Sequence, residues 1–353
     1  MDNPYRSLPA RAFWSRSVAR GFTPGDVYTG PKPLLSQGAR VMSAGSCFAA
    51  NLVPYLEANG FCYVRTEPMT TRLGVEPEAL SYGKFSAAYG NLYTPRQLLQ
   101  LLQRALGQFH PVEDRWHIDG AVIDTFRPGL RYTASDDQEF DALTQSHLKA
   151  VVKAVQQCDA FIFTLGLTEA WISSLDGAVF PACPGTVHGE FDPSRHRFHN
   201  FDVVETSSDL IAALEIVQKI NPACRIILTV SPVPLVATAT GSHVLASTVY
   251  SKSVLRVAAE QATKRISNCV YFPAYEIVTG PQAPEQFFKP NKRDVTEDAI
   301  ATVMSGFFAC CGIYTPGSTP VKEANAAHDP SNALSTLAQR IAAIECEEAA
   351  ADL

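Results

Sequence analysis

Two runs of six residues, Ala160–Leu165 and Arg225–Val230, are mainly apolar and show no alternation with polar side chains. A strand buried on one face alternates, whereas a strand covered on both faces of a parallel sheet forms a continuous apolar run. Helix-like stretches separate these runs from three further strand-like stretches, at residues 39–43, 61–65 and 269–272. The pattern predicts a three-layer α/β domain with a central parallel sheet of about five strands.

Length and composition narrow the classes of function. The 353 residues carry a formal net charge of −6 and no dense run of Lys and Arg, which argues against nucleic acid as a partner. No stretch approaches the roughly 20 apolar residues that a membrane span needs, and the N-terminus does not resemble a secretory signal. Nine cysteines without a Cys-x-x-Cys pair favour free thiols in a reducing cytoplasm over disulfides or structural zinc.

The chain divides into segments of different character. Residues 1–37 are expected to form an N-terminal extension that packs on the main domain, which spans 38–313. Within it, 66–140 is expected to be an insertion of loops around one helix. Residues 314–331 resemble a linker, and 332–353 a short helix with an apolar stripe. The stripe is expected to dock on the domain or on a partner, with self-association as the alternative: Leu334, Leu337, Ile341 and Ile344.

Ser46 lies at the turn between the first strand and a predicted helix that continues to Gly60. A serine at such a turn holds its hydroxyl near unpaired N–H groups that favour a developing oxyanion. The alternative is a helix N-cap, the commonest role of a serine in this position. Because the carboxyl ends of parallel strands form sites, and residues 166–169 and 231–234 share that edge, we favour the nucleophile.

Residues 44–49, Ala-Gly-Ser-Cys-Phe-Ala, resemble the motif of the GSCFA family, a branch of the SGNH and GDSL-like hydrolases. The resemblance covers roughly residues 38–310, through the stretches 164–171, 183–186, 229–235, 250–256 and 271–276. It implies a flavodoxin-like SGNH-hydrolase fold and an esterase or acyltransferase that forms an acyl-Ser46 intermediate without a cofactor or metal. By analogy with the fold, the substrate is a small-molecule or carbohydrate ester.

The resemblance also assigns residues to roles. Ser46 takes the position of the nucleophile. The third block of the superfamily is Gly-x-Asn-Asp, and here Thr168 stands where the amide donor is expected. Its hydroxyl still donates one hydrogen bond, so we expect it to act with the Cys47 N–H in an oxyanion hole. Three loops would then bind the substrate and its oxyanion: Cys47, Gly90, Asn91, Gly166, Thr168 and Glu169.

The general base is the point of greatest departure from the superfamily. Its members carry Asp-x-x-His before the last helix, whereas this chain has Asn291 and Asp294 at that spacing. Three explanations remain open: a histidine elsewhere serves as base, burial raises the pKa of Asp294, or the protein binds a ligand without catalysis. His243, in a loop after the strand that ends at Val230, is the preferred base, and a histidine without a role is the alternative.

A second group of histidines lies in a Pro- and Gly-rich segment, at His188, His196 and His199. Together with Asp192 these side chains offer ligands for a metal ion, but their spacing is not diagnostic of one. The sequence favours a lid or substrate-facing loop over a metal site.

Three more residues have two interpretations each. Cys47 offers a thiol nucleophile, although its side chain is expected to point away from that of Ser46 and to be buried. Lys252 and Arg256 form either an anion-binding face or an ordinary solvated helix face.

Overall fold

Five parallel strands form the central sheet of the computed structural model, which describes residues 3–67 and 82–313. Their order across the sheet is β2-β1-β5-β9-β10, the 2-1-3-4-5 order of flavodoxin-like domains. Every pairing between neighbours is parallel, so the predicted α/β fold with a five-stranded parallel sheet is confirmed. The strands are β1 (Arg40–Gly45), β2 (Cys62–Tyr63), β5 (Ala160–Leu165), β9 (Arg225–Val230) and β10 (Cys269–Tyr271).

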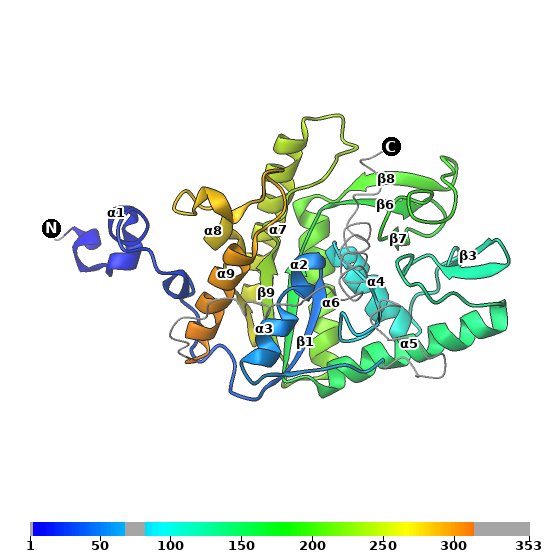
Figure 1. Cartoon of the computed structure of the whole chain (residues 1–353), viewed down its shortest axis with the longest axis horizontal. Helices are drawn as coiled ribbons and strands as arrows, with labels where there is room; N and C mark the ends of the chain where they lie inside the picture. Colours follow the sequence, from blue (N-terminus) through cyan, green and yellow to red (C-terminus); the bar gives the residue numbers. More distant parts are fainter. Residues whose placement is uncertain (1–2, 68–81, 314–353) are drawn as a thin grey trace, which may run out of the picture.

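Helices cover both faces of this sheet (Figure 1). One layer consists of α4 (Pro95–Ala105), α5 (Asp137–Gln157), α6 (Val203–Ile220) and α7 (Val244–Arg265). The other consists of α3 (Val53–Ala58), α8 (Ala274–Thr279) and α9 (Glu297–Cys310). Each layer has its own hydrophobic core against the sheet, which is why the strands are apolar on both sides.

The central strand β5 shows how one apolar run serves two cores. Phe161 and Phe163 point into the core under α5 and α6, whereas Ala160 and Ile162 point into the core under α3 and α9. All four side chains are buried. Alternation of direction along the strand therefore produces no alternation of polarity.

The predicted helix between Ser46 and Gly60 is two short helices. The first, α2, spans Cys47–Ala50, and α3 begins at Val53 with Pro54 in its first turn. Proline has no N–H to donate to the carbonyl four residues earlier, here that of Ala50. Apolar residues recur every four positions across this break, so their spacing predicted one continuous helix.

Two small sheets replace loops that were expected. Within the insertion, β3 (Arg115–Ile118) and β4 (Ala121–Asp124) form an antiparallel hairpin joined by Asp119 and Gly120, both with positive φ. An Asp-Gly pair is a hairpin turn signal that the sequence reading had not used. The segment expected to form a lid, around His188 to His199, contributes β8 (His196–Asn200). This strand joins β6 (Glu169–Ser173) and β7 (Val179–Phe180) in a three-stranded antiparallel sheet.

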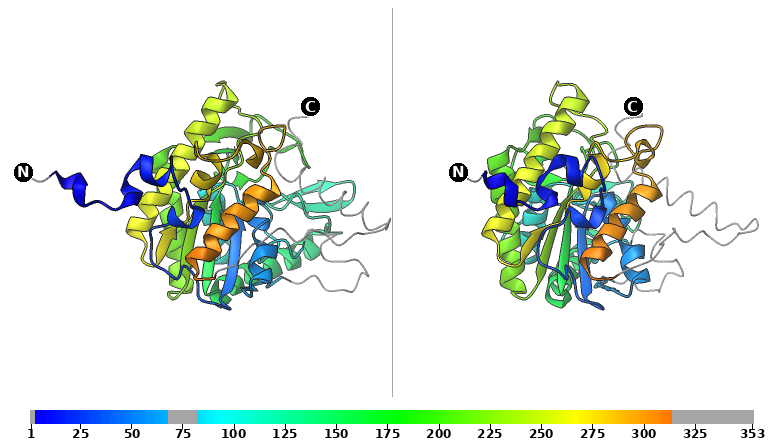
Figure 2. Two further views of the ribbon diagram at one scale, coloured as in Figure 1. Left: turned by 60° about the vertical axis from the view of Figure 1, so that its left-hand side comes forward. Right: turned by 90° about the vertical axis from the view of Figure 1, so that its left-hand side faces the viewer.

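The N-terminal segment contains α1 (Trp14–Ser17) and the 3-10 helices η1 (Pro4–Ser7), η2 (Ala10–Ala12) and η3 (Pro24–Asp26). Its first part projects from the domain in Figure 1 and in the left-hand view of Figure 2. Farther along, the Leu34 N–H donates to Cys310 O at the end of α9 (2.8 Å). Within the described ranges, no helix has both the length and the apolarity to cross a membrane. The predicted linker and C-terminal helix, and residues 68–81, lie outside those ranges.

Phe163→Ala is expected to lower the free energy of unfolding by about 3–5 kcal/mol, because it opens a cavity between β5 and the α5–α6 layer. Val204→Ala, at an exposed position of α6, is the control and should change stability by less than about 0.5 kcal/mol. Chemical denaturation of both variants measures the difference. Equal values would contradict the two-faced burial of the sheet.

Candidate functional site

Ser46 stands at the carboxyl end of β1, where it is the N-cap residue of α2. Its carbonyl accepts from the Ala49 N–H at 2.8 Å, but its hydroxyl makes no capping hydrogen bond. The Oγ atom is buried and has no hydrogen-bond partner in the structure, and the residue is only 4% exposed. The cap that would give this serine an ordinary structural role is therefore not formed.

Gly45 sets the position of Ser46. Its φ of +139° is a backbone conformation that residues with a side chain rarely adopt, and a Cβ atom here would lie 2.4 Å from the Thr164 carbonyl oxygen. The Gly45 carbonyl accepts from the Leu92 N–H at 2.8 Å. The end of β1 is thus pressed against β5 on one side and bonded to the segment around Leu92 on another.

The segment around Leu92 joins the ends of β1 and β5. Next to Leu92, the Tyr93 carbonyl accepts from the N–H groups of Gly166 and Leu167, at 2.9 and 3.0 Å. The loop residues Gly90, with a φ of +67°, and Asn91, 7% exposed, come directly before this junction. The loop after β1 and the loop after β5 are therefore brought together through residues 92 and 93.

Two side chains of α7 hydrogen-bond the loop after β5, residues 166–168. The sequence did not predict either contact. Lys252 Nζ donates to Gly166 O at 2.7 Å, and Ser251 Oγ accepts from the Thr168 N–H at 3.0 Å. Lys252 is 1% exposed, so the expectation of a solvated or anion-binding face fails at this residue. A signal was present, because Lys252 shares a helical stripe with the buried Leu255 and Ala259.

Arg256, the other residue of that expected face, has protein partners. Its guanidinium bonds Glu276 at 3.0 Å and Glu260 at 3.1 Å, and it lies over the ring of Tyr271. Its charge therefore joins α7 to α8.

The hydroxyl of Thr168 is already used within the protein. It donates to Asn200 Oδ1 at 2.7 Å, and the two residues are adjacent because β6 and β8 pair antiparallel. This bond directs the acceptor end of the Asn200 amide toward Thr168 and leaves its Nδ2 donor on the other side. Sequence reasoning missed Asn200 because it did not predict the β6–β8 pairing.

Glu169 anchors the loop that follows β9. Its carboxylate accepts from Thr238 Oγ1 at 2.7 Å and from the Ala239 N–H at 3.4 Å. Burial raises the pKa of Glu169 above its usual value, and these two hydrogen bonds oppose the increase. Glu169 thus holds loop 231–243 over the carboxyl end of the sheet.

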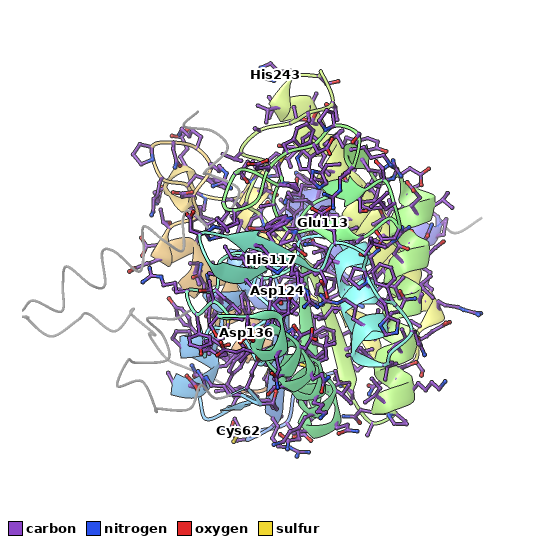
Figure 3. The ribbon with its side chains drawn as sticks, turned by 90° about the vertical axis from the view of Figure 1, so that its right-hand side faces the viewer. Cys62, Glu113, His117, Asp124, Asp136 and His243 are labelled. Atoms are coloured by element: carbon purple, nitrogen blue, oxygen red, sulfur yellow. The ribbon has the colours of Figure 1, made fainter. Side chains whose placement is uncertain are left out.

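His243 lies at the exposed tip of the same loop, far out on the carboxyl-end side (Figure 3). Its ring caps α7, with Nδ1 accepting from the Leu245 N–H at 3.1 Å. The ring makes no hydrogen bond to Ser46 Oγ.

Asp294 lies in a tight turn, where its N–H donates to Asn291 Oδ1 at 3.0 Å and its carboxylate faces Arg293 at 3.5 Å. Of the three predicted catalytic side chains, none hydrogen-bonds another in this structure.

The second group of histidines is divided among structural contacts. His196 Nε2 lies 3.2 Å from both carboxylate oxygens of Glu113, which also accepts from Arg195 at 2.7 Å. His199 instead pairs with Glu205 on α6 at 2.9 Å. Across the described ranges, no group of three or more His, Cys, Asp and Glu side chains could hold a metal ion.

An open groove of about 1050 Å³ lies between the N-terminal segment and residues 275–282 of α8 and the turn after it. Its lining includes none of the predicted site residues.

Gly45→Ala is expected to destabilise the fold more than Gly107→Ala by at least about 1 kcal/mol. Both glycines have positive φ, but a Cβ at Gly107 would meet open space, whereas one at Gly45 would overlap the Thr164 backbone. Denaturant unfolding of the two variants measures the difference, to which the overlap and the larger φ of Gly45 both contribute. Equal losses would mean that the contact between β1 and β5 is not tight at this point.

Glu169→Gln should become more stable relative to the wild type as the pH rises from about 4 to 7. Because burial raises the pKa of Glu169, its charged form is disfavoured in the folded protein, and the wild type loses stability as this carboxyl ionises. A neutral glutamine has no such loss. Unfolding curves at several pH values give the difference between the variant and the wild type.

Glu139→Gln is the control, because its stability relative to the wild type should change with pH in the opposite direction. Hydrogen bonds from Tyr132 and Ser135 lower the pKa of Glu139 to about 2, so its ionisation stabilises the folded protein. This variant should lose stability relative to the wild type as the pH rises. A constant difference for Glu169→Gln would contradict the burial of its carboxylate.

Comparison with known families matches residues 40–307 to the model of the GSCFA family. No curated protein matches the chain. The matched range begins at the first residue of β1 and ends within α9, so it spans the whole central sheet and the loops at its carboxyl end.

Proposed function

Because the chain belongs to the GSCFA family, we propose that it is a serine-dependent acyl-ester hydrolase or O-acyltransferase of the SGNH type. The observation that carries the proposal is Ser46 Oγ, a buried hydroxyl that makes no capping bond. Leaving a buried hydroxyl without a hydrogen bond costs free energy, so a group of this kind calls for an explanation, of which a catalytic role is one.

In the proposed reaction, Ser46 Oγ attacks the carbonyl carbon of an ester while its proton passes to a base. The alcohol leaves with a proton as the tetrahedral intermediate collapses, and an acyl-Ser46 ester remains. Water or an acceptor alcohol then takes the acyl group and restores the serine. Hydrolysis and transfer share every step except this last one.

Donors for the oxyanion would come from the loops at the ends of β1 and β5. We assign this role to the Cys47 N–H and to Gly90 and Asn91, which the Leu92–Gly45 bond holds beside the end of β1. The Thr168 hydroxyl donates to Asn200 and is therefore already used. We assign the side-chain donor role expected of Thr168 to Asn200 Nδ2 on β8.

His243 is the proposed base, with Asp294 as the alternative. The His243 ring is exposed and caps α7, so its role requires the tip of loop 238–243 to move toward Ser46. Catalytic hydrogen bonds are often formed only in the substrate complex, and such a movement is consistent with that behaviour. Glu169 would hold the base of the loop while its tip moves.

A non-catalytic ligand-binding module is the second candidate. It is favoured by the 4% exposure of Ser46 and by the lack of any hydrogen bond from its Oγ to an imidazole or carboxylate. In that case the loops around Ser46 would bind an ester or carbohydrate without cleaving it.

The proposed substrate is a small-molecule or carbohydrate ester, on the analogy of other SGNH folds. We also propose a reducing, cytoplasmic setting. Its support is the seven free thiols among the described cysteines, of which Cys158 and Cys224 form a thiol–thiol hydrogen bond at 3.6 Å and no disulfide.

A fluorophosphonate should form a single adduct with the wild-type protein, detected by intact mass, and Ser46→Ala should abolish it. Ser231→Ala is the matched control, because Ser231 follows β9 as Ser46 follows β1 and its side chain is also buried. It should keep the adduct. His243→Ala should slow labelling strongly if His243 is the base, whereas slowing in Asp294→Asn would move that role to Asp294.

Stability provides the control for Ser46→Ala. Loss of a true N-cap costs about 1 kcal/mol, whereas loss of an unpaired buried hydroxyl should cost nothing or stabilise the protein. An unlabelled wild type together with a destabilised Ser46→Ala would contradict the enzyme and leave the binding module.

A further inference from the structure

A small cavity lies between α4, the turn after β4 and α5, and the mechanism above does not use it. Its volume is about 30 Å³, and its polar lining includes Gln97, Arg104, Arg127 and His147. Room for one water-sized sphere takes about 10–15 Å³, so the cavity holds only one or two particles of that size.

Arg104 is the unusual member of this lining. It is 7% exposed, and its guanidinium carbon lies 4.2 Å from the centre of the Phe126 ring, which also borders the cavity. Within the ranges that the structure describes, its guanidinium has no hydrogen bond or ion pair. Asp124 and Asp114 attract its charge through space, whereas burial and Arg127 disfavour it. A buried cation that no counter-charge contacts directly is strongly disfavoured, so Arg104 calls for a partner.

The neighbouring carboxylates are occupied by other groups. The two oxygens of Asp124, labelled in Figure 3, accept from the Phe126 N–H at 2.8 Å and from Arg127 Nε at 2.7 Å. Glu67 accepts from Arg127 at 3.2 Å and from His147 Nδ1 at 2.7 Å. Neither carboxylate bonds Arg104.

Gln97 adds a donor to the lining. Its Oε1 accepts from the N–H groups of Tyr93 and Thr94, both at 2.9 Å, which leaves the Nε2 hydrogens as the free end of the amide. The cavity is therefore bordered by two buried guanidinium groups and an amide donor.

We propose that this cavity binds a monatomic inorganic anion, chloride in the cell, between Arg104 and Arg127. The volume excludes a metabolite that carries a carboxylate or phosphate, and the donors favour an anion over a cation. The anion would give Arg104 a charged partner in direct contact, which neither Asp124 nor Asp114 provides among the described residues.

The position of the cavity connects it to the loop beside Ser46. Tyr89 and Leu92 border the cavity, and they flank Gly90 and Asn91 in the chain. A bound anion would therefore stabilise the position of this loop through Tyr89 and Leu92. This inference does not depend on Ser46 being a nucleophile.

The test measures thermal unfolding of the full chain in sodium chloride, sodium bromide and sodium gluconate at equal ionic strength. Chloride and bromide should raise the midpoint with saturation, because a ligand of the folded state alone stabilises it. Gluconate is too large for the cavity and should not. In crystals grown with bromide, an anomalous peak should lie between Arg104 and Arg127.

Arg104→Gln should lose the halide-specific rise. The matched control is Arg96→Gln, since Arg96 is on the same helix and stacks on Phe201 but has its own partner, Asp209, at 2.6 Å. It should keep the full rise. Equal midpoints in chloride and gluconate, or a rise that Arg104→Gln retains, would overturn the proposal. If Arg104→Gln does not fold, the wild-type crystal decides, and the lack of a bromide peak overturns it.

Discussion

The close contact between Gly45 and the backbone of Thr164 is the constraint on which the arrangement of the site depends. It brings the ends of the two central strands so near that no side chain fits between them. The chain must then turn sharply at Ser46, and the Gly45 carbonyl is left to accept from Leu92. Three loops from distant parts of the sequence are thereby fixed to one another through main-chain hydrogen bonds, which depend little on side-chain identity.

The sheet could be predicted from sequence because its signal is large and local. Residues such as Phe161 and Ile162 are apolar for opposite cores, so whole strands are uninterrupted apolar runs. The weaker elements were missed because their causes are single residues. Pro54 divides a helix whose apolar spacing is otherwise regular, and the pair Asp119 and Gly120 makes a hairpin.

The candidate site could be predicted only in part, because some of its contacts leave no local pattern in the sequence. Sequence order identified the loops at the carboxyl ends of the strands, because parallel topology places them on one edge. It could not show that Thr168 donates to Asn200, since that contact depends on an antiparallel pairing between segments about thirty residues apart. Nor could it show that the His243 ring caps α7, because a loop residue carries no periodic pattern.

The hydrogen bond from Leu34 to Cys310 has a topological consequence. It joins the segment that enters β1 to the end of the last described helix, at the edge of the sheet opposite Ser46 (Figure 1). The packing of Gly25 on α9 adds to this hydrogen bond, so the chain enters and leaves the domain at neighbouring points. A circularly permuted chain that connected these two points and opened elsewhere would keep every strand in its place, and fused domains attached there would leave the opposite edge unobstructed.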